Sequence, residues 1–376
     1  MGAFSWSITI AIESGLVEGR LAYDYVRGGT SDLDKAVKDG ISWTFDRLTQ
    51  NRVLIEWMRI HNERSGRRPV NFYGFDLAGS PGLGRARRGV QTALSEALAY
   101  VATVDASAAT HLRGRLDTLL PNLRFDLCRV QGDGGYDRLS AAERDSLTGA
   151  VADLIALFKR NEQMYGQRRG TAEFAWGYRA ALNARDVDLW LKQLPLGWKP
   201  AHPLERLGSE ATSFLSAANE VRDQAQANNL QWIVEQEGRE GRVLVFAHRY
   251  HLSAAPIRAT WAGPREHRVM GTYLRAGFGP RFVSIGQCVG EGEVNTGEGT
   301  ETLQRAPSDS IDSLAAQVSN VGYLLDLRCV PPEVARWLQC SCVLGFGSTG
   351  AEAGVLEASI GRAFDLILYQ GPVTPA

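Results

Sequence analysis

The chain has 376 residues, of which 44% are hydrophobic and 22% are charged, and its formal net charge is −1. Such a composition is typical of a globular protein that is too long for one ordinary core. The near-neutral charge gives no electrostatic reason to expect nucleic acid or an anionic membrane as a partner. No apolar run reaches the length that crosses a bilayer, and five cysteines without paired spacing argue against a disulfide framework. We therefore expect a cytoplasmic protein.

The N-terminal part of the chain alternates between predicted strands and helices. Residues 6–13 have the pattern of a buried strand that ends on Glu13. Helical patterns follow over residues 17–25 and about 41–62. A second strand is predicted over residues 70–75, where Asp76 and a loop rich in glycine and proline end it.

The middle of the chain, from about residue 85 to residue 198, contains no convincing strand pattern. Its helical patterns cover residues 90–105, 108–120, 140–165 and 170–194. We interpret residues 85–199 as a helical insertion that forms one wall of a cleft. The α/β core then consists of residues 1–84 and 200–376. Aromatic residues of the insertion that line the cleft would suit a large, mostly apolar substrate.

The C-terminal part alternates again between helices and strands. The predicted order is helix 208–237, strand 243–247, helix 264–276, strand 281–287 and strands near 322–327 and 364–369. The segment 288–308, rich in glycine and glutamate, is interpreted as a mobile or lid-like connection. This alternation predicts an α/β fold with a mostly parallel sheet flanked by helices.

Two histidines follow the predicted strand at residues 243–247. His248 and His251 are three residues apart, beyond the end of a buried apolar run. Ligands of open α/β sheets bind beyond the carboxyl ends of the strands, and imidazole titrates near neutral pH. The pair is therefore a candidate for proton transfer or for metal ligation. The alternative is that one histidine caps a loop and the other is a satisfied core residue.

The sequence around the pair resembles the erythromycin esterase family. The resemblance extends along nearly the whole chain, and its segments occur in the expected order. The matching segments are Asn71 to Asp76, Asn219 to Trp232 with Arg222-Asp223, Ala247-His-x-x-His251, Met270 to Gly286, Leu324 to Arg328, and Phe364 to Tyr369.

The resemblance implies hydrolysis of a small-molecule ester, with macrolide lactones, and hence antibiotic resistance, as the best-known context. His248 or His251 would be the base that activates water, and Glu13 would orient the base or serve as a second base. Asp76 and Arg222 are candidates for substrate binding. Structural alternatives are a salt-bridged Glu13, an Asp76 that caps its own loop, and a buried ion pair of Arg222. We expect no cofactor and no metal, although a histidine pair keeps a metal-dependent hydrolase as an alternative. The sequence leaves the oligomeric state open.

The chain departs from the family pattern at its start. Family members carry a Gly-Glu-x-x-His-Gly motif on an earlier strand, and no histidine of this chain lies in that context. The first hypothesis is an erythromycin esterase-like hydrolase that lacks its N-terminal segment in the sequence as given, and is therefore weakly active or inactive. The second is a catalytically inactive relative that binds a small molecule.

Overall fold

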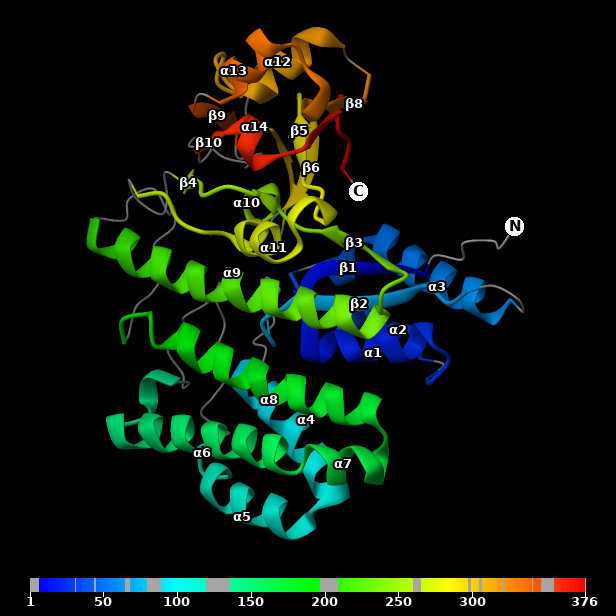
Figure 1. The fold of residues 1–376 in the computed structure, drawn as a ribbon, viewed down its shortest axis with the longest axis vertical. Coiled ribbons are helices and arrows are strands. Elements are labelled where there is room, and N and C mark those ends of the chain that lie inside the picture. The colour runs from blue at the N-terminus through cyan, green and yellow to red at the C-terminus, as the bar shows by residue number, and fades with distance from the viewer. Residues whose placement is uncertain are drawn as a thin grey trace. The chain divides into compact units, whose positions relative to one another are not determined.

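A computed structural model describes most of the chain, and its residues form two compact units (Figure 1). The first unit comprises Met1–Pro200 and Asn228–Phe246, and the second comprises Ala201–Ala227 and Ala247–Ala376. The described residues are 7–30, 32–43, 45–64, 68–79, 89–119, 136–196, 209–259, 265–296, 299–303, 306–319, 321–339, 341–345 and 355–375.

A three-stranded parallel sheet organises the first unit. It consists of β1 (Ser7–Gly15), β2 (Asn71–Asp76) and β3 (Gly241–Phe246) in the order β2-β1-β3. Ile12 of β1 is the register partner of Gly74 on one side and of Phe246 on the other. Because all three strands run in the same direction, their carboxyl ends meet at one edge of the sheet.

Three helices bury an apolar core against this sheet. They are α1 (Leu16–Val26), α2 (Leu33–Gly40) and α3 (Thr49–Glu63), with the 3₁₀ turn η1 (Phe45–Arg47) before α3. Asp32 caps α2 by accepting a hydrogen bond from the Lys35 backbone. The buried core residues are Ile12, Ala22, Tyr25, Val26, Ala36, Val37, Ile41, Ile55, Met58, Val70 and Phe72.

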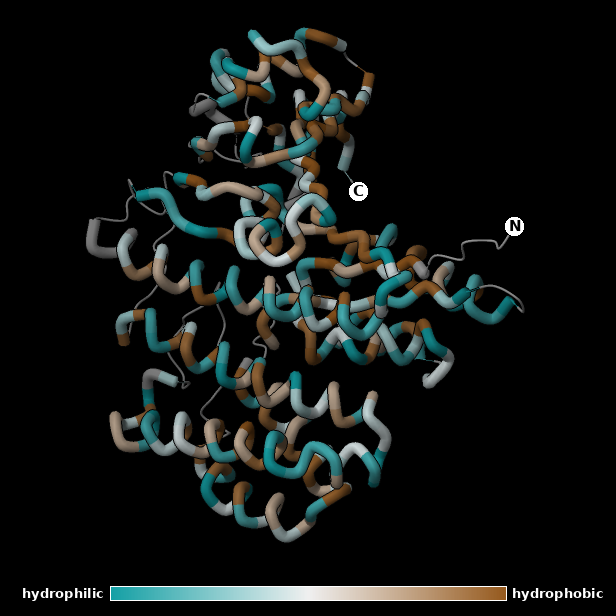
Figure 2. The backbone as a smooth tube through the Cα atoms, viewed as in Figure 1, coloured by the Kyte–Doolittle hydropathy of each residue, from teal (hydrophilic) through white to brown (hydrophobic). Residues whose placement is uncertain are grey.

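The rest of the first unit is helical. Its helices are α4 (Gly89–Val104), α5 (Ala106–Leu116), α6 (Ala141–Arg160), α7 (Glu162–Arg169), α8 (Thr171–Leu191) and the second half of α9 (Ser209–Glu237), and a 3₁₀ turn η3 (Tyr136–Arg138) precedes α6. Figure 2 shows hydrophobic and hydrophilic residues alternating along these helices, as expected for helices with one buried face. Ser140 and Glu143 form a capping box at the start of α6. The rings of Tyr100, Phe158 and Phe174 pack together inside the bundle.

The second unit contains three small sheets. β5 (Ile285–Val289), β11 (Leu366–Gln370) and β8 (Tyr323–Asp326) form a sheet in the order β5-β11-β8, in which β5 is parallel and β8 antiparallel to β11. The strands β4 (Arg258–Ala259), β10 (Val355–Ser359) and β9 (Ser341–Gly345) pair antiparallel. β6 (Glu293–Thr296) and β7 (Gly299–Thr302) form a hairpin.

Short helices connect these sheets. They are α10 (Arg249–Leu252), α11 (Met270–Phe278), α12 (Ile311–Val318), α13 (Pro332–Leu338) and α14 (Ile360–Ala363), with the 3₁₀ turns η6 (Gly279–Arg281) and η7 (Leu327–Cys329). Apolar side chains from both larger sheets and from these helices form one core, which includes Ile257, Leu356, Phe364 and Ile367.

The predicted α/β class is confirmed. Helices α4 to α8 follow one another where helical patterns were predicted, and β3 and β11 occupy predicted strand positions. One strand was predicted too early, because η6 occupies residues 279–281 and β5 begins only at Ile285. The segment 288–308, interpreted as a lid-like connection, contains the β6–β7 hairpin. The division into a core (1–84 and 200–376) and an insertion (85–199) stays a prediction.

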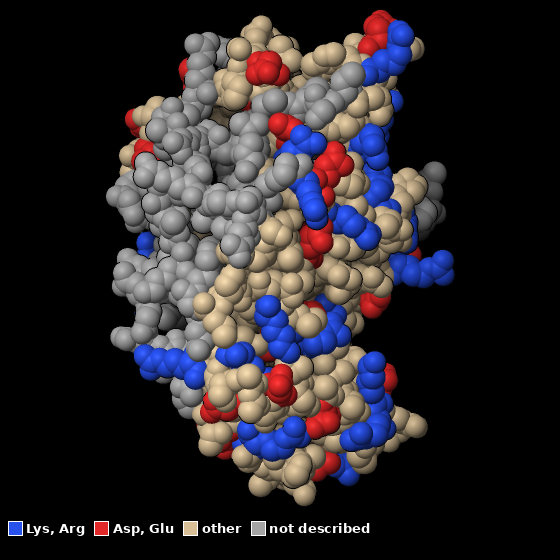
Figure 3. Space-filling view, turned by 90° about the vertical axis from the view of Figure 1, so that its left-hand side faces the viewer, with Lys and Arg blue, Asp and Glu red and all other residues tan. Residues whose placement is uncertain are grey.

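Surface charge and helix hydropathy do not point to a nucleic acid or a membrane as a partner. On the described part of the face drawn in Figure 3, Lys and Arg side chains are interspersed with Asp and Glu. A mixed surface of this kind produces no strong field of one sign. Among the described residues, no helix combines the length and the apolar character needed to span a bilayer.

Gly74 gives a test of the fold because β2 passes very close to the end of β1 at this residue. A Cβ atom on Gly74 would lie 2.6 Å from the Ser14 carbonyl oxygen and closer still to that of Gly15. Backbone atoms cannot move aside cheaply, so Gly74→Ala should lower the free energy of unfolding by about 1–3 kcal/mol. Urea unfolding followed by circular dichroism measures the change. Gly114→Ala is the control, because a Cβ there meets nothing within 4 Å; equal losses in both variants would contradict the account.

Candidate functional site

The carboxyl edge of the parallel sheet carries two of the predicted site residues. Glu13 lies near the end of β1 and is buried, and Asp76 ends β2 as the register partner of Gly15. The Oδ1 atom of Asp76 accepts a hydrogen bond from the Leu77 backbone, and Oδ2 accepts one from the Trp43 indole at 2.9 Å. Asp76 therefore caps its own loop and holds Trp43.

A third carboxylate at this edge, Glu18, escaped the sequence analysis. It lies buried in the first turn of α1, and its Oε1 accepts hydrogen bonds from the Ser42 hydroxyl and the Gly79 backbone. Trp43, the residue after Ser42, has φ +60°, a conformation that is unfavourable for a bulky side chain. The signal that could have found Glu18 is an acid in the first turn of a helix, where the helix dipole favours negative charge.

The two histidines of the second unit lie in different environments. His251 is inside α10 and only 5% exposed, whereas His248 precedes the helix as its N-cap residue and is exposed. Arg249, one of the two residues between them, is buried and pairs with Asp312 of α12 at 2.7 Å. It also donates a hydrogen bond to the Gln287 carbonyl of β5. These contacts fix the short helix that carries both imidazoles.

Both ring nitrogens of His251 have hydrogen-bond partners. Nδ1 lies 2.7 Å from Oδ1 of Asp223, and Nε2 lies 3.2 Å from Nη1 of Arg222. A carboxylate only accepts and a guanidinium only donates. The neutral ring therefore carries its proton on Nδ1 and its lone pair on Nε2. That is the tautomer of a general base that is oriented by a carboxylate.

Asp223 connects three helices. It lies on α9, its side chain is fully buried, and its Oδ1 also accepts a hydrogen bond from the Met270 backbone at the start of α11, at 2.7 Å. The sequence analysis offered a buried ion pair of Arg222 as an alternative to substrate binding, and it did not identify His251 as a partner of Arg222 or of Asp223. Asp223 and His251 are 28 residues apart in sequence and come into contact only in the folded chain. Local sequence spacing could therefore not predict this contact.

His248 has the opposite tautomer. Its Nδ1 accepts a hydrogen bond from the Tyr250 backbone at 3.3 Å, which caps the start of α10. Because Nδ1 is an acceptor here, the neutral ring carries its proton on Nε2. In these neutral forms, Nε2 of His248 is a hydrogen-bond donor and Nε2 of His251 is a hydrogen-bond acceptor.

Two further aromatic residues pack against each other in this unit, because the rings of Tyr250 and His267 have centroids 5.9 Å apart. The Tyr250 ring packs edge-on against His251, with ring centroids 4.9 Å apart, and burial raises the pKa of its hydroxyl. His267 is also buried, and its Nδ1 donates a hydrogen bond to the Arg265 carbonyl at 3.1 Å. Burial lowers the pKa of His267 and so favours its neutral form. Neither residue was singled out from the sequence.

The described residues contain no cluster of three or more His, Cys, Asp or Glu side chains able to hold a metal ion. Of the predicted site residues, the structure brings Arg222 and His251 into contact in the second unit. It places Glu13 and Asp76 at the same edge of the sheet in the first unit.

Removal of the Asp223 carboxylate should destabilise the second unit. In Asp223→Ala, the buried Nδ1–H of His251 and the Met270 N–H both lose their acceptor. The expected loss is about 3 kcal/mol in the free energy of unfolding, measured by urea titration. Asp34→Ala, which removes a surface carboxylate paired with Arg52, is the control and should leave the midpoint nearly unchanged. An Asp223→Ala midpoint equal to that of the control would exclude the anchoring role.

His267 predicts a specific pH dependence of stability. Its folded pKa lies below the unfolded value of about 6.5, so the unfolded chain takes up a proton that the folded chain excludes. Stability is therefore lost as pH falls from about 7.5 to about 5.5. In His267→Phe, the urea midpoint should drop less over this interval than in the wild type. The exposed His111→Gln is the control and should keep the full drop; an identical drop in all three proteins would refute the assignment.

Comparisons with known proteins agree with this architecture. A Bacillus cereus protein of known structure is similar with a TM-score of 0.75 and 19% identity, over 98% of this chain and 82% of that one. The structure of a succinoglycan biosynthesis protein is similar with a TM-score of 0.69 and 18% identity, over 98% of this chain and 80% of that one. The structure of a mutant of the erythromycin esterase EreC, in its open conformation, is similar with a TM-score of 0.64 and 12% identity, over 97% of this chain and 83% of that one.

These identities are low, so the three likenesses show a shared fold. No curated protein matches the sequence. The family model described as erythromycin esterase matches residues 8–370, nearly the whole chain. The chain therefore belongs to the erythromycin esterase family.

Proposed function

We propose that the protein hydrolyses an ester or a macrolide lactone with water activated by His251. The observation that carries the proposal is the buried hydrogen bond between Asp223 and His251, which leaves the lone pair of the ring on Nε2. Family membership supports a hydrolase, and the macrolide is the substrate class that the family name suggests.

Arg222 has two roles in this proposal. In the structure its guanidinium donates a hydrogen bond to Nε2 of His251. When a substrate binds, the guanidinium turns toward a substrate oxygen, and the attacking water takes its place on Nε2. The cation then stabilises the negative charge that develops on the carbonyl oxygen, and His251 accepts the proton of the water.

His248 supplies the complementary group. Its Nε2–H donates a hydrogen bond to the ester, and the imidazolium formed on His251 then gives the proton taken from the water to the leaving alkoxide. Two histidines with opposite tautomers thus provide a proton acceptor and a hydrogen-bond donor. Glu13 remains a candidate for a second base, and Asp76 a candidate for substrate binding, as the sequence predicts.

The exposed His248 gives the clearest test, because its replacement should not disturb the fold. Asparagine also caps helices, so His248→Asn keeps the start of α10. We expect kcat for erythromycin and for a p-nitrophenyl ester to fall by about 10²- to 10⁴-fold, with unchanged circular dichroism and urea midpoint. His111→Gln, an exposed histidine in α5, is the matched control.

Wild-type activity that survives in His248→Asn would contradict the donor role. A folded wild-type protein that binds the macrolide but hydrolyses neither substrate would contradict the proposal that the protein is a hydrolase. That result would instead support the non-catalytic binding relative.

A further inference from the structure

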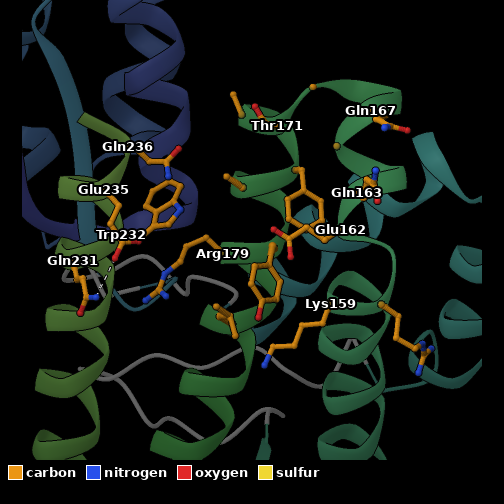
Figure 4. A pocket seen from close by; sticks show the side chains of 18 of the residues that line it. Lys159, Glu162, Gln163, Gln167, Thr171, Arg179, Gln231, Trp232, Glu235 and Gln236 are labelled. Carbon is orange, nitrogen blue, oxygen red and sulfur yellow. Dashed lines mark hydrogen bonds between the residues drawn. The ribbon is translucent and has the colours of Figure 1, made fainter. Parts of the chain in front are cut away.

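The helical part of the first unit contains a large open cavity. Its volume is about 1350 Å³, and it lies between α7, α8 and the second half of α9 (Figure 4). The end of α6 closes one side with Lys159 and Arg160. None of the residues that surround it belongs to the site proposed for ester hydrolysis, so it requires its own explanation.

A buried arginine reaches into this cavity. Arg179 projects from α8 toward α9, as Figure 4 shows, and is 7% exposed. Its Nε donates to Oδ1 of Asn229 at 2.7 Å, and Asn229 in turn donates to the Phe75 carbonyl. Its Nη2 has no hydrogen-bond partner. Asn229 therefore holds the guanidinium in one orientation, in which the buried Nη2 group lacks an acceptor.

An unsatisfied donor on a buried cation is costly, because the group has lost its water without gaining an acceptor. Burial lowers the pKa of Arg179 to about 10, and the nearby carboxylate of Asp186 only partly offsets that effect. At neutral pH the guanidinium is still charged. An anionic oxygen bound to Nη2 would satisfy it with a charge-assisted hydrogen bond.

The remaining wall is polar and aromatic. Five amide side chains line it, from Gln163, Gln167, Asn228, Gln231 and Gln236, together with the rings of Phe174, Tyr178 and Trp232. Amides donate and accept hydrogen bonds, as hydroxyl groups do, and aromatic faces pack against the C–H faces of sugar rings. Aliphatic side chains are few in the described lining, namely Ala172, Ala175 and Leu182. Such a wall is unsuited to an apolar macrolide.

The charges of the cavity limit the ligand to a small negative charge. Lys159, Arg160 and Arg179 are cationic, while Glu162 and Glu235 are anionic. A polyphosphate would require a larger cationic excess. We propose that this cavity binds a carbohydrate that carries a carboxylate, with the carboxylate on Arg179 and the hydroxyl groups on the surrounding amides.

Isothermal titration calorimetry on the full chain tests the proposal with 3′-sialyllactose, a trisaccharide that carries one carboxylate, as the probe. Maltotriose, a neutral trisaccharide, and inorganic phosphate are the two comparison ligands. We expect 3′-sialyllactose to bind at least about tenfold more tightly than either, because only it offers both a carboxylate and sugar hydroxyls. Arg179→Gln should weaken its binding by about tenfold or more.

Arg169→Gln is the matched control, because it removes the same charge from an exposed position at the end of α7 that does not line the cavity. Its Kd should stay within about twofold of the wild type. Gln231→Ala changes an exposed lining residue and should weaken binding by about three- to tenfold. This variant decides the matter if Arg179→Gln fails to fold.

Several results would overturn the proposal. These are absence of 3′-sialyllactose binding, equal affinity for maltotriose, or displacement of 3′-sialyllactose by phosphate at equal concentration. Unchanged affinity in folded Arg179→Gln or in Gln231→Ala would do the same. The readout is binding, so it is independent of whether the protein hydrolyses esters.

Discussion

One buried carboxylate oxygen, Oδ1 of Asp223, organises the second unit. It accepts hydrogen bonds from His251 of α10 and from the first backbone N–H of α11, and thereby ties both helices to α9. A buried carboxylate is tolerated only when strong donors replace its water. The positions of α9, α10 and α11 are therefore set together, and the chemistry of the histidine pair depends on that arrangement.

The same anchor explains why two histidines three residues apart differ. His251 is held inside the protein by a carboxylate and a guanidinium, whereas His248 ends outside and caps the helix through Nδ1. Each contact selects one tautomer, so one ring offers a hydrogen-bond acceptor and the other a hydrogen-bond donor. The buried pair of Arg249 and Asp312 keeps the intervening turn rigid. Such a rigid mount is what proton transfer to a substrate requires.

Local pattern was sufficient for much of the fold and for part of the site. The apolar run before His248 predicted β3, and the helical patterns predicted α4 to α9, because burial of one face leaves a periodic trace in sequence. The start of β5 was misplaced because nothing in the local pattern identified η6 as a turn. The partner of His251, the caps formed by Glu18, and the orientation of Arg179 all depend on contacts between distant segments. Residue types alone cannot specify such contacts.

The opposite tautomers of the two histidines are the central claim, and ¹⁵N-detected NMR of the imidazole rings measures them directly. Spectra of the wild type, assigned with His248→Asn, report which ring nitrogen carries the proton in each neutral ring. The account predicts the proton on Nδ1 of His251 and on Nε2 of His248 at neutral pH. The same tautomer for both rings, or the reverse assignment, would contradict it.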